Sequence, residues 1–261
     1  MNLNYIGVLT ILTYLSAALA QGLYLFGFIS SSRWRYLTCA ALCIAAHGWI
    51  LYKFIETPQG QNLNWLIMLS FTLWIMNIIS LLTSRQSKSE NLSILNYPLS
   101  AFSIILMLSF AGSDVIETKN QLGVLAHIFI SMLAMSFLIL ASLQAILMGL
   151  QNYLLKHHHP SPMLRILPPL QSMESLLFTI IWLGMIFLSG SLLSGFYFQV
   201  GLFTPFLLPK TLLAVSAWIL LTALLIGHRL FGWRGPTAIR WTISGSCLAF
   251  LSYFGTKALL L

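Results

Sequence analysis

The stretch KTLLAVSAWILLTALLIGHRLFGWRGPTAIRWTISGSCLAFLSYFG, residues 210–255, consists of two apolar runs joined by a short basic segment. Runs of about 18 or more apolar residues are typical of helices that cross a membrane. The segment between them, residues 226–240, holds three of the chain's 13 lysine and arginine residues, Arg229, Arg234 and Arg240. The pattern therefore predicts two membrane-spanning helices connected by a tight, positively charged turn.

Four other residues of the basic segment also suit a turn at a membrane surface. Gly232 and Gly235 permit backbone conformations that other residues rarely adopt, and Pro236 is well placed to start the second helix. Trp233 is the kind of aromatic residue that lies at the interface between lipid and water. We expect the arginines to anchor the turn against anionic lipid.

The rest of the chain has the same apolar character. Of its 261 residues, 58% are hydrophobic and 7% are charged, whereas a soluble domain has roughly 45–50% and 25%. The long unbroken runs predict helices rather than the short alternating strands of a barrel. We expect an all-α polytopic membrane protein with a single transmembrane domain over residues 1–261 and eight spans: 5–28, 36–55, 64–82, 92–111, 122–154, 173–198, 209–227 and 236–260.

The first span has an alternative interpretation as a cleaved signal peptide. Residues 16–21, SAALAQ, place Ala18 and Ala20 as a signal-peptide cleavage site would. However, residues 1–15 contain no lysine or arginine, and the apolar run continues through residues 22–29. We therefore expect the first helix to be retained.

The lysines and arginines are distributed unevenly between the two sides of the predicted bundle. Basic residues concentrate in cytoplasmic loops, so the richer side is cytoplasmic and both termini lie outside. Lipid anchoring alone explains the net charge of +8, without a nucleic-acid partner. The odd-numbered loops carry Arg33, Arg35, Arg85, Lys88, Lys156, Arg165, Arg229, Arg234 and Arg240, whereas the even-numbered loops and the C-terminus carry Lys53, Lys119, Lys210 and Lys257.

Three histidines lie within or at the end of predicted spans, where ionisable groups are costly and usually face a protein interior, a cavity or a ligand. At 1.5 Å per residue, His47 lies about 10–12 Å and His127 about 8 Å from the outer ends of their helices. Two neutral histidines at similar depth on separate helices suit axial ligation of a haem iron. Alternatively, each hydrogen-bonds a serine or a carbonyl of a neighbouring helix. His228 lies near the cytoplasmic face, too far away to share a metal with the other two.

Other chemistry has less support in the sequence. Cys39, Cys43 and Cys247 form no C-x-x-C pair, and two of them are spaced as packing residues on one helix face. The tract KHHHP, residues 156–160, is a weak candidate for a transition-metal site. No nucleophile–base pair and no phosphate-binding loop is present, so we expect no enzymatic activity. The halves show no repeat of the kind found in many secondary transporters.

Several segments resemble the cytochrome c assembly superfamily of haem-handling membrane proteins. They are PPLQSMESLLFTIIWLGMIFLSGSLLSG (168–195), PKTLLAVSAWILL (209–221), GHRLFGWRGPTAIRWTISG (227–245) and SYFG (252–255). The resemblance is best over residues 120–258 and extends to AHG around His47 and LAHIFISMLA around His127. It is strongest to the small eight-helix branch of HemX-like or YpjD-like inner-membrane proteins.

The chain departs from the haem-handling members of this superfamily in one segment. Those members carry an external tryptophan-rich segment of the WGxxWxWD type, which presents haem. The corresponding residues 195–210, GFYFQVGLFTPFLLPK, contain no tryptophan and no aspartate. They do contain the aromatic residues Phe196, Tyr197, Phe198, Phe203 and Phe206.

The resemblance implies an inner-membrane protein that binds a b-type haem and assists cytochrome c biogenesis or haem metabolism, with cytochrome c maturation proteins as partners. His47 and His127 are then the leading pair of ligands. His228 is a candidate for a second site, where Arg229 and Arg234 pair with haem propionates or an anionic lipid headgroup. The alternative is a non-enzymatic scaffold, such as an accessory subunit of an ion transporter, that has lost the haem-presenting surface.

Overall fold

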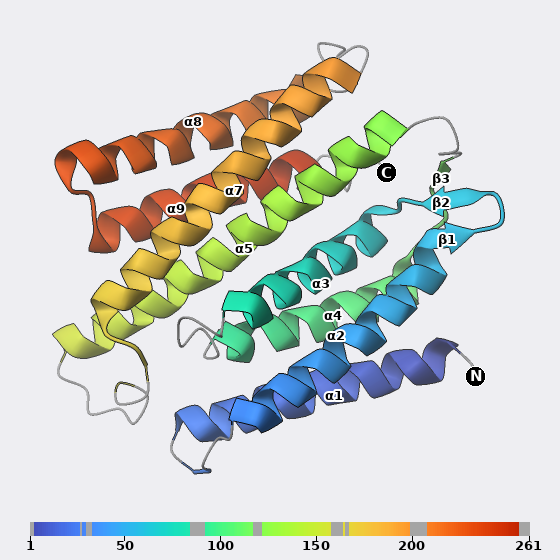
Figure 1. The fold of residues 1–261 in the computed structure, drawn as a ribbon, viewed down its shortest axis with the longest axis horizontal. Coiled ribbons are helices and arrows are strands. Elements are labelled where there is room, and N and C mark those ends of the chain that lie inside the picture. The colour runs from blue at the N-terminus through green and yellow to red at the C-terminus, as the bar shows by residue number, and fades with distance from the viewer. Residues whose placement is uncertain are drawn as a thin grey trace. The chain divides into compact units, whose positions relative to one another are not determined.

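The computed structural model describes residues 3–26, 28–29, 33–83, 92–116, 122–157, 164, 167–198 and 208–255, which are almost entirely helical. Figure 1 shows how the helices follow one another along the chain. The long helices are α1 (Leu3–Leu25), α2 (Arg33–Ile55), α3 (Trp65–Thr83), α4 (Ser93–Phe110), α5 (Leu122–Lys156), α7 (Leu170–Phe198), α8 (Leu208–Phe231) and α9 (Gly235–Phe250), and a π-helix, η2 (Leu251–Gly255), follows the last.

Seven helices in the described part of the chain, α1 to α5, α7 and α8, are long and apolar enough to cross a membrane. This confirms the prediction of an all-α polytopic membrane protein. Helix α9 has only 16 residues, but it continues directly into the π-helix that ends at Gly255. The two together rise about 30 Å, close to the thickness of a hydrocarbon core. The count of eight spans and the outer position of the termini stay predictions.

The helices form two compact units, residues 1–117 with 151–169, and residues 118–150 with 170–261. The expectation of a single transmembrane domain also stays a prediction. In the first unit, α1 packs against α2 and α4, and α3 packs against the same two helices. A close contact joins α2 to α3, because the Trp74 ring lies against Gly48 and its Nε1 donates a hydrogen bond to the Ile44 carbonyl at 2.8 Å.

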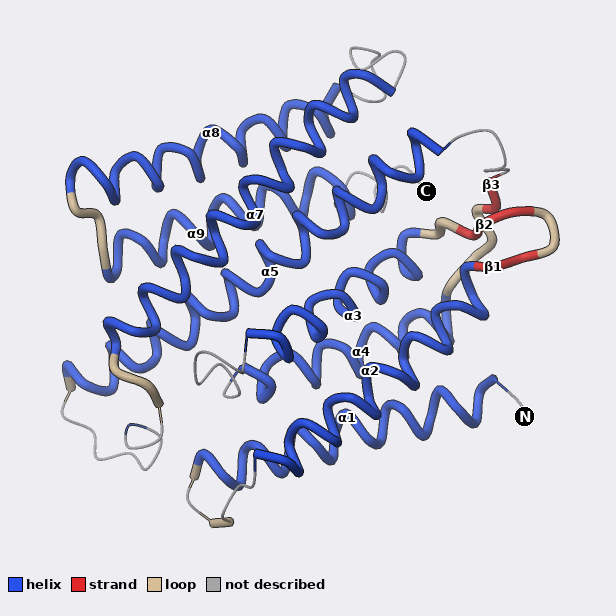
Figure 2. The backbone as a smooth tube through the Cα atoms, viewed as in Figure 1, coloured by secondary structure: helices blue, strands red, loops and turns tan. Residues whose placement is uncertain are grey.

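A small antiparallel sheet, which the sequence analysis did not predict, connects the ends of three helices in the first unit. It consists of β1 (Glu56–Thr57), β2 (Gly60–Asn62) and β3 (Val115–Ile116), shown in red in Figure 2. The Asn62 side chain holds the sheet to the chain that follows α4. Its Oδ1 accepts from the Asp114 backbone N–H at 3.0 Å, and its Nδ2 donates to the Gly112 carbonyl at 3.1 Å.

In the second unit, α8 packs against both α7 and α9. Polar contacts fasten α5 to its neighbours. Ser246 Oγ on α9 donates to the Leu138 carbonyl on α5 at 3.1 Å, and Gln144 Nε2 on α5 donates to the Met173 carbonyl on α7 at 3.0 Å. These bonds supply, inside the protein, the partners that lipid does not offer to buried polar groups.

The turn between α8 and α9 has the predicted structure. Gly232 and Gly235 have φ values of 66° and 54°, which L residues with a side chain rarely adopt. Pro236 lies in the first turn of α9. The Trp233 ring packs against Gly227, and the Trp233 N–H donates to the Gly227 carbonyl at 3.2 Å. The turn is therefore tight because both glycines and the close tryptophan contact are present.

The predicted orientation has a direct test in cysteine labelling of intact cells. In a variant with the three native cysteines replaced by serine, we expect Lys53→Cys to react with a membrane-impermeant maleimide. Lys156→Cys should react only after the membrane is permeabilised, because the positive-inside rule puts it in the cytoplasm. Both lysines are exposed, so the reverse labelling pattern would contradict the orientation.

Candidate functional site

His47 lies at the centre of the first unit and is fully buried. Both of its ring nitrogens have hydroxyl partners on other helices. Nδ1 lies 3.2 Å from the Tyr14 hydroxyl on α1, and Nε2 lies 2.9 Å from Ser70 Oγ on α3. Both lone-pair and N–H positions of the neutral ring are therefore in use. The sequence analysis gave haem ligation and hydrogen bonding to a neighbouring helix as alternatives for His47. In the structure, His47 makes hydrogen bonds that join α2 to α1 and α3.

The polar contacts of His47 continue along the interface of α3 and α4. Ser70 Oγ lies 3.2 Å from Ser103 Oγ, and further along the two helices Asn77 Nδ2 donates to Ser100 Oγ at 2.6 Å. Asn96, fully buried on α4, has no partner for either side-chain atom among the described residues. Because an unpaired buried amide is costly, we expect this interface to hold an ordered water.

His127 on α5 has a different environment in the second unit. Its Nδ1 lies 3.0 Å from Ser194 Oγ on α7, and the Ser194 hydroxyl donates its one proton to the Ser191 carbonyl at 3.1 Å. Nδ1 must therefore carry the proton in this hydrogen bond, and Nε2 of the neutral ring keeps a lone pair. Among the hydrogen bonds of the described residues none involves Nε2, while the Ser191 backbone is a further polar neighbour of the ring. A histidine that ligates a metal commonly donates its other N–H in this way.

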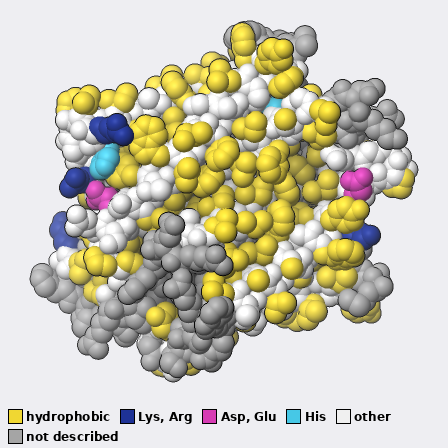
Figure 3. All heavy atoms as spheres, in the orientation of Figure 1, with side chains coloured by type: hydrophobic (Ala, Val, Ile, Leu, Met, Phe, Trp, Pro, Cys, Tyr) yellow, Lys and Arg dark blue, Asp and Glu magenta, His cyan; other side chains and the backbone are white. Residues whose placement is uncertain are grey.

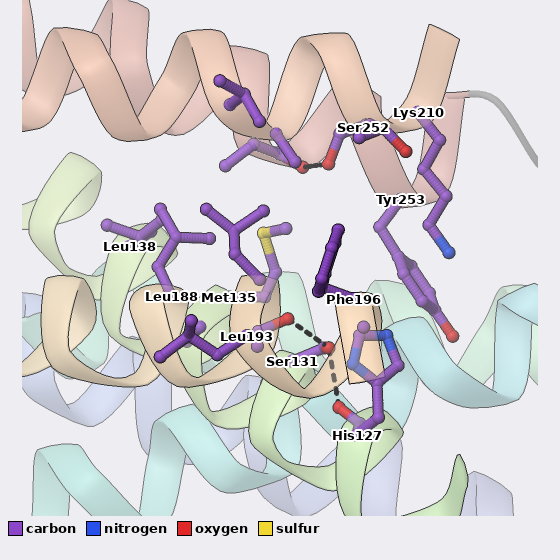
Figure 4. A pocket seen from close by; sticks show the side chains of 18 of the residues that line it. His127, Ser131, Met135, Leu138, Leu188, Leu193, Phe196, Lys210, Ser252 and Tyr253 are labelled. Atoms are coloured by element: carbon purple, nitrogen blue, oxygen red, sulfur yellow. Dashed lines mark hydrogen bonds between the residues drawn. The ribbon is translucent and has the colours of Figure 1, made fainter. Parts of the chain in front are cut away.

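The His127 ring lines a cavity of about 550 Å³ between α5, α7, α8 and the C-terminal helix. This volume lies in the range of roughly 300–1,000 Å³ that is typical of small-molecule and cofactor sites. Figure 4 shows His127, Lys210 and Tyr253 at one end of the cavity and Leu138 and Leu188 at the other. The walls are mainly apolar, and the polar groups gather at the histidine end.

Two further features shape the histidine end of this cavity. Lys210 Nζ lies over the Tyr253 ring, 4.9 Å from its centroid, so a positive charge stands close to His127. Gly195 on α7 lies against the imidazole, because a Cβ atom at this position would be 3.0 Å from His127 Cε1. The glycine therefore allows the ring to pack close to α7 while it also faces the cavity.

His228 lies at the other end of α8, in a second cavity of about 460 Å³. Its Nδ1 donates to the Trp233 carbonyl at 2.9 Å, and its ring stacks on Phe178 with centroids 3.5 Å apart. Arg229 and Arg234 line the same cavity. Arg234 Nε lies 3.5 Å from Glu174 Oε1. The structure thus brings together His228, Arg229 and Arg234 in one cavity, which is not the cavity of His127.

The three predicted histidines therefore divide among three environments. His47 belongs to the first unit, whereas His127 and His228 belong to the second and line separate cavities. That His47 and His127 ligate one haem, and that the residues around His228 bind another, stay predictions. The sequence analysis missed Ser194, Lys210 and Tyr253. The spacing of Ser191 and Ser194 on one helix face was the available signal for a polar site opposite His127.

The weaker candidates have no site in the described structure. His157 is exposed, and its Nδ1 lies 2.9 Å from the Tyr153 carbonyl in its own helix. The rest of the tract 156–160, from residue 158, lies outside the described residues. No group of three or more His, Cys, Asp or Glu residues that could hold a metal occurs among the residues described. Phe196, Tyr197 and Phe198 are exposed, whereas Phe203 and Phe206 also lie outside the described part.

Comparison with known proteins links this arrangement to one family. The family model for cytochrome C assembly protein matches residues 37–261, which include all three histidines. The chain is similar to the inner membrane protein YpjD of Escherichia coli (strain K12), with 28% identity over 229 residues that cover 86% of each chain. An uncharacterized 28.8 kDa protein of Azospirillum brasilense is 29% identical over 134 residues, 50% of this chain and 49% of that protein. No solved structure matches the chain significantly.

The contacts of His47 predict a measurable contribution to stability. Ser70→Ala removes the partner of Nε2 and should lower the free energy of unfolding by about 1 kcal/mol, within the range of hydrogen bonds between membrane helices. The measurement is an SDS titration in mixed micelles followed by circular dichroism. Ser16→Ala is the matched control, because the exposed Ser16 hydroxyl bonds the Thr13 carbonyl of its own helix. Equal effects of the two substitutions would refute the structural role.

Proposed function

Because the chain belongs to the cytochrome c assembly protein family, we propose that it binds a b-type haem in the inner membrane and assists cytochrome c biogenesis or haem handling. It would do so by holding the haem, without catalysing a covalent step. The inner-membrane location follows from its similarity to the inner membrane protein YpjD and from the seven membrane-capable helices among the described residues. The partners of such a protein are the bilayer and other cytochrome c maturation proteins.

The observation that carries the proposal is the state of His127. Its Nδ1–H donates to Ser194 Oγ. The Ser194 hydroxyl in turn donates to the Ser191 carbonyl. The remaining nitrogen, Nε2, has the lone pair that an axial ligand of haem iron needs. The hydrogen bond at Nδ1 also fixes the ring orientation and increases its basicity as a ligand.

The cavity beside His127 has the composition that a porphyrin requires. Its walls are apolar, with Met135, Leu138 and Leu188 away from the histidine. These side chains would contact the macrocycle and exclude water. Lys210 at the histidine end supplies a positive charge that suits a propionate. When bound, the haem would supply a redox-active iron, and the protein residues would set its ligation and surroundings.

His47 is a less direct ligand candidate in this proposal. To bind iron through Nε2 it would have to leave Ser70, and to bind through Nδ1 it would have to leave Tyr14. Each change would leave a fully buried hydroxyl without that partner, at a cost. The proposal therefore rests on His127, and the participation of His47 is a separate question for the experiment below.

The satisfied state of His47 favours a second candidate function, a scaffold without haem. In that case both histidines are packing residues, and the bundle serves as an accessory subunit of another membrane complex, for example an ion transporter. The absence of tryptophan from residues 195–210 is consistent with this alternative. The two functions differ in whether the purified protein contains haem.

Substitution of His127 tests the proposal by absorption spectroscopy. Wild-type protein purified in mild detergent from haem-replete cells should show a Soret band and a sharp α band in the reduced state. His127→Gly should lose these bands, because it removes the lone pair at Nε2. Added imidazole should restore them, since a free ligand can enter the space that the side chain vacates.

The matched control is His157→Gly, which changes an exposed histidine on the same helix. It should leave the spectrum unchanged. Loss of haem in both His47→Ala and His127→Gly, with His157→Gly intact, would indicate a pair of histidine ligands. A wild-type protein without haem, even after haem supplementation, would refute haem binding and favour the scaffold.

A further inference from the structure

In the second unit, two cavities lie between α7 and α8 and are separate from the His127 cavity. One has a volume of about 460 Å³ and is lined by charged and polar groups. The other has a volume of about 400 Å³ and is lined mainly by apolar side chains. Both include Trp182 and Arg229. The two cavities therefore adjoin, and together they offer a polar end and an apolar groove along the same pair of helices.

The polar end has a net positive charge, because one of its two arginines has no carboxylate partner among the described residues. Arg234 is paired with Glu174, so these two charges largely cancel. Arg229 lies over the Trp182 ring, with Cζ 5.4 Å from the ring centroid, and the ion pairs among the described residues give it no carboxylate partner. Figure 3 shows basic side chains beside a histidine and an acidic side chain at the α8–α9 turn. One monoanion would balance this charge.

His228 adds a second polar contact at this end. Its Nδ1 proton is committed to the Trp233 carbonyl, and its ring is fixed by stacking on Phe178. Nε2 has no hydrogen-bond partner among the residues that the structure describes. Nε2 of the neutral ring carries a lone pair, so it would accept a hydrogen bond from a headgroup hydroxyl beside the guanidinium of Arg229.

The apolar groove extends from Arg229 into the depth of the bilayer. Its lining on α8 runs from Arg229 back to Trp218, about 16 Å at 1.5 Å per residue. This is about half the thickness of a hydrocarbon core, the depth of one leaflet. Trp182, Met185, Ile186, Leu225 and Ile226 line the groove. A single acyl chain matches the length of this apolar groove and its volume of about 400 Å³.

We propose that the two cavities form one binding site for an anionic phospholipid, with its phosphate at Arg229, a headgroup hydroxyl at His228 and one acyl chain in the groove between α7 and α8. The charge of the polar end matches a phosphodiester monoanion, and the fork of an arginine suits phosphate oxygens. The site is independent of the proposed haem site, with which it shares no lining residue. A lipid held here would tie the start of α7 to the end of α8.

Native mass spectrometry of the full chain in detergent, titrated with phosphatidylglycerol, tests this site. Wild-type protein should retain one phosphatidylglycerol more tightly than phosphatidylcholine. Arg229→Gln should weaken this retention about tenfold or more, because it removes a charge-assisted hydrogen bond. Arg240→Gln is the matched control, since Arg240 is exposed and lines neither cavity. It should leave retention unchanged.

A second variant and a competitor distinguish the ligand from other anions. Ile226→Trp fills the apolar groove and should also weaken retention, whereas inorganic phosphate should not displace the lipid. Displacement by inorganic phosphate would mean that the site binds a free anion. Equal losses in the Arg229 and Arg240 variants would mean unspecific attraction. If Arg229→Gln lost its haem but retained phosphatidylglycerol as well as the wild type does, Arg229 would be assigned to a haem propionate. Each of these three results would overturn the lipid site.

Discussion

A polar side chain inside a membrane must find its partners within the protein, because lipid offers no hydrogen bonds. His47 and His127 meet this constraint in opposite ways. His47 uses two hydroxyls from two other helices, and no nitrogen remains for a ligand. His127 uses one hydroxyl, and that hydroxyl is itself committed to a carbonyl, so the second nitrogen keeps its lone pair. One constraint thus produces a packing residue in the first unit and a candidate ligand in the second.

The same constraint explains how polar groups are distributed over the second unit. The half-buried hydroxyl of Ser194 and the buried hydroxyl of Ser246 bond carbonyls of their own or a neighbouring helix. The charged side chains Arg229, Arg234 and Glu174 lie instead near the helix ends, where water and lipid headgroups are within reach. Trp182 is shared by the polar and apolar cavities there. A ligand with a charged headgroup and an apolar chain could occupy both cavities at once. The proposed lipid site therefore depends on how α7 and α8 pack together and not on any single residue.

The seven membrane-capable helices of the described residues and the α8–α9 turn were predictable because they depend on local properties. Apolar run length predicts a membrane helix whatever it packs against, and Gly232, Gly235 and Pro236 act through their own backbone preferences. The partners of the histidines were not predictable, since Tyr14, Ser70 and Ser194 are far from them in sequence. Many serines occupy these helices, and their positions do not reveal which one faces a histidine. The short sheet was missed because its strands of two or three residues carry no periodic pattern.

The account's central claim is that the cavity beside His127 holds haem by the Nε2 nitrogen. The most direct test is an electron cryomicroscopy structure of the chain in lipid nanodiscs, prepared from haem-replete cells. We predict porphyrin density in this cavity, with the iron joined to His127 Nε2 and with Ser194 still bonded to Nδ1. An acyl chain in the cavity, or a haem whose iron is bound elsewhere, would contradict the claim.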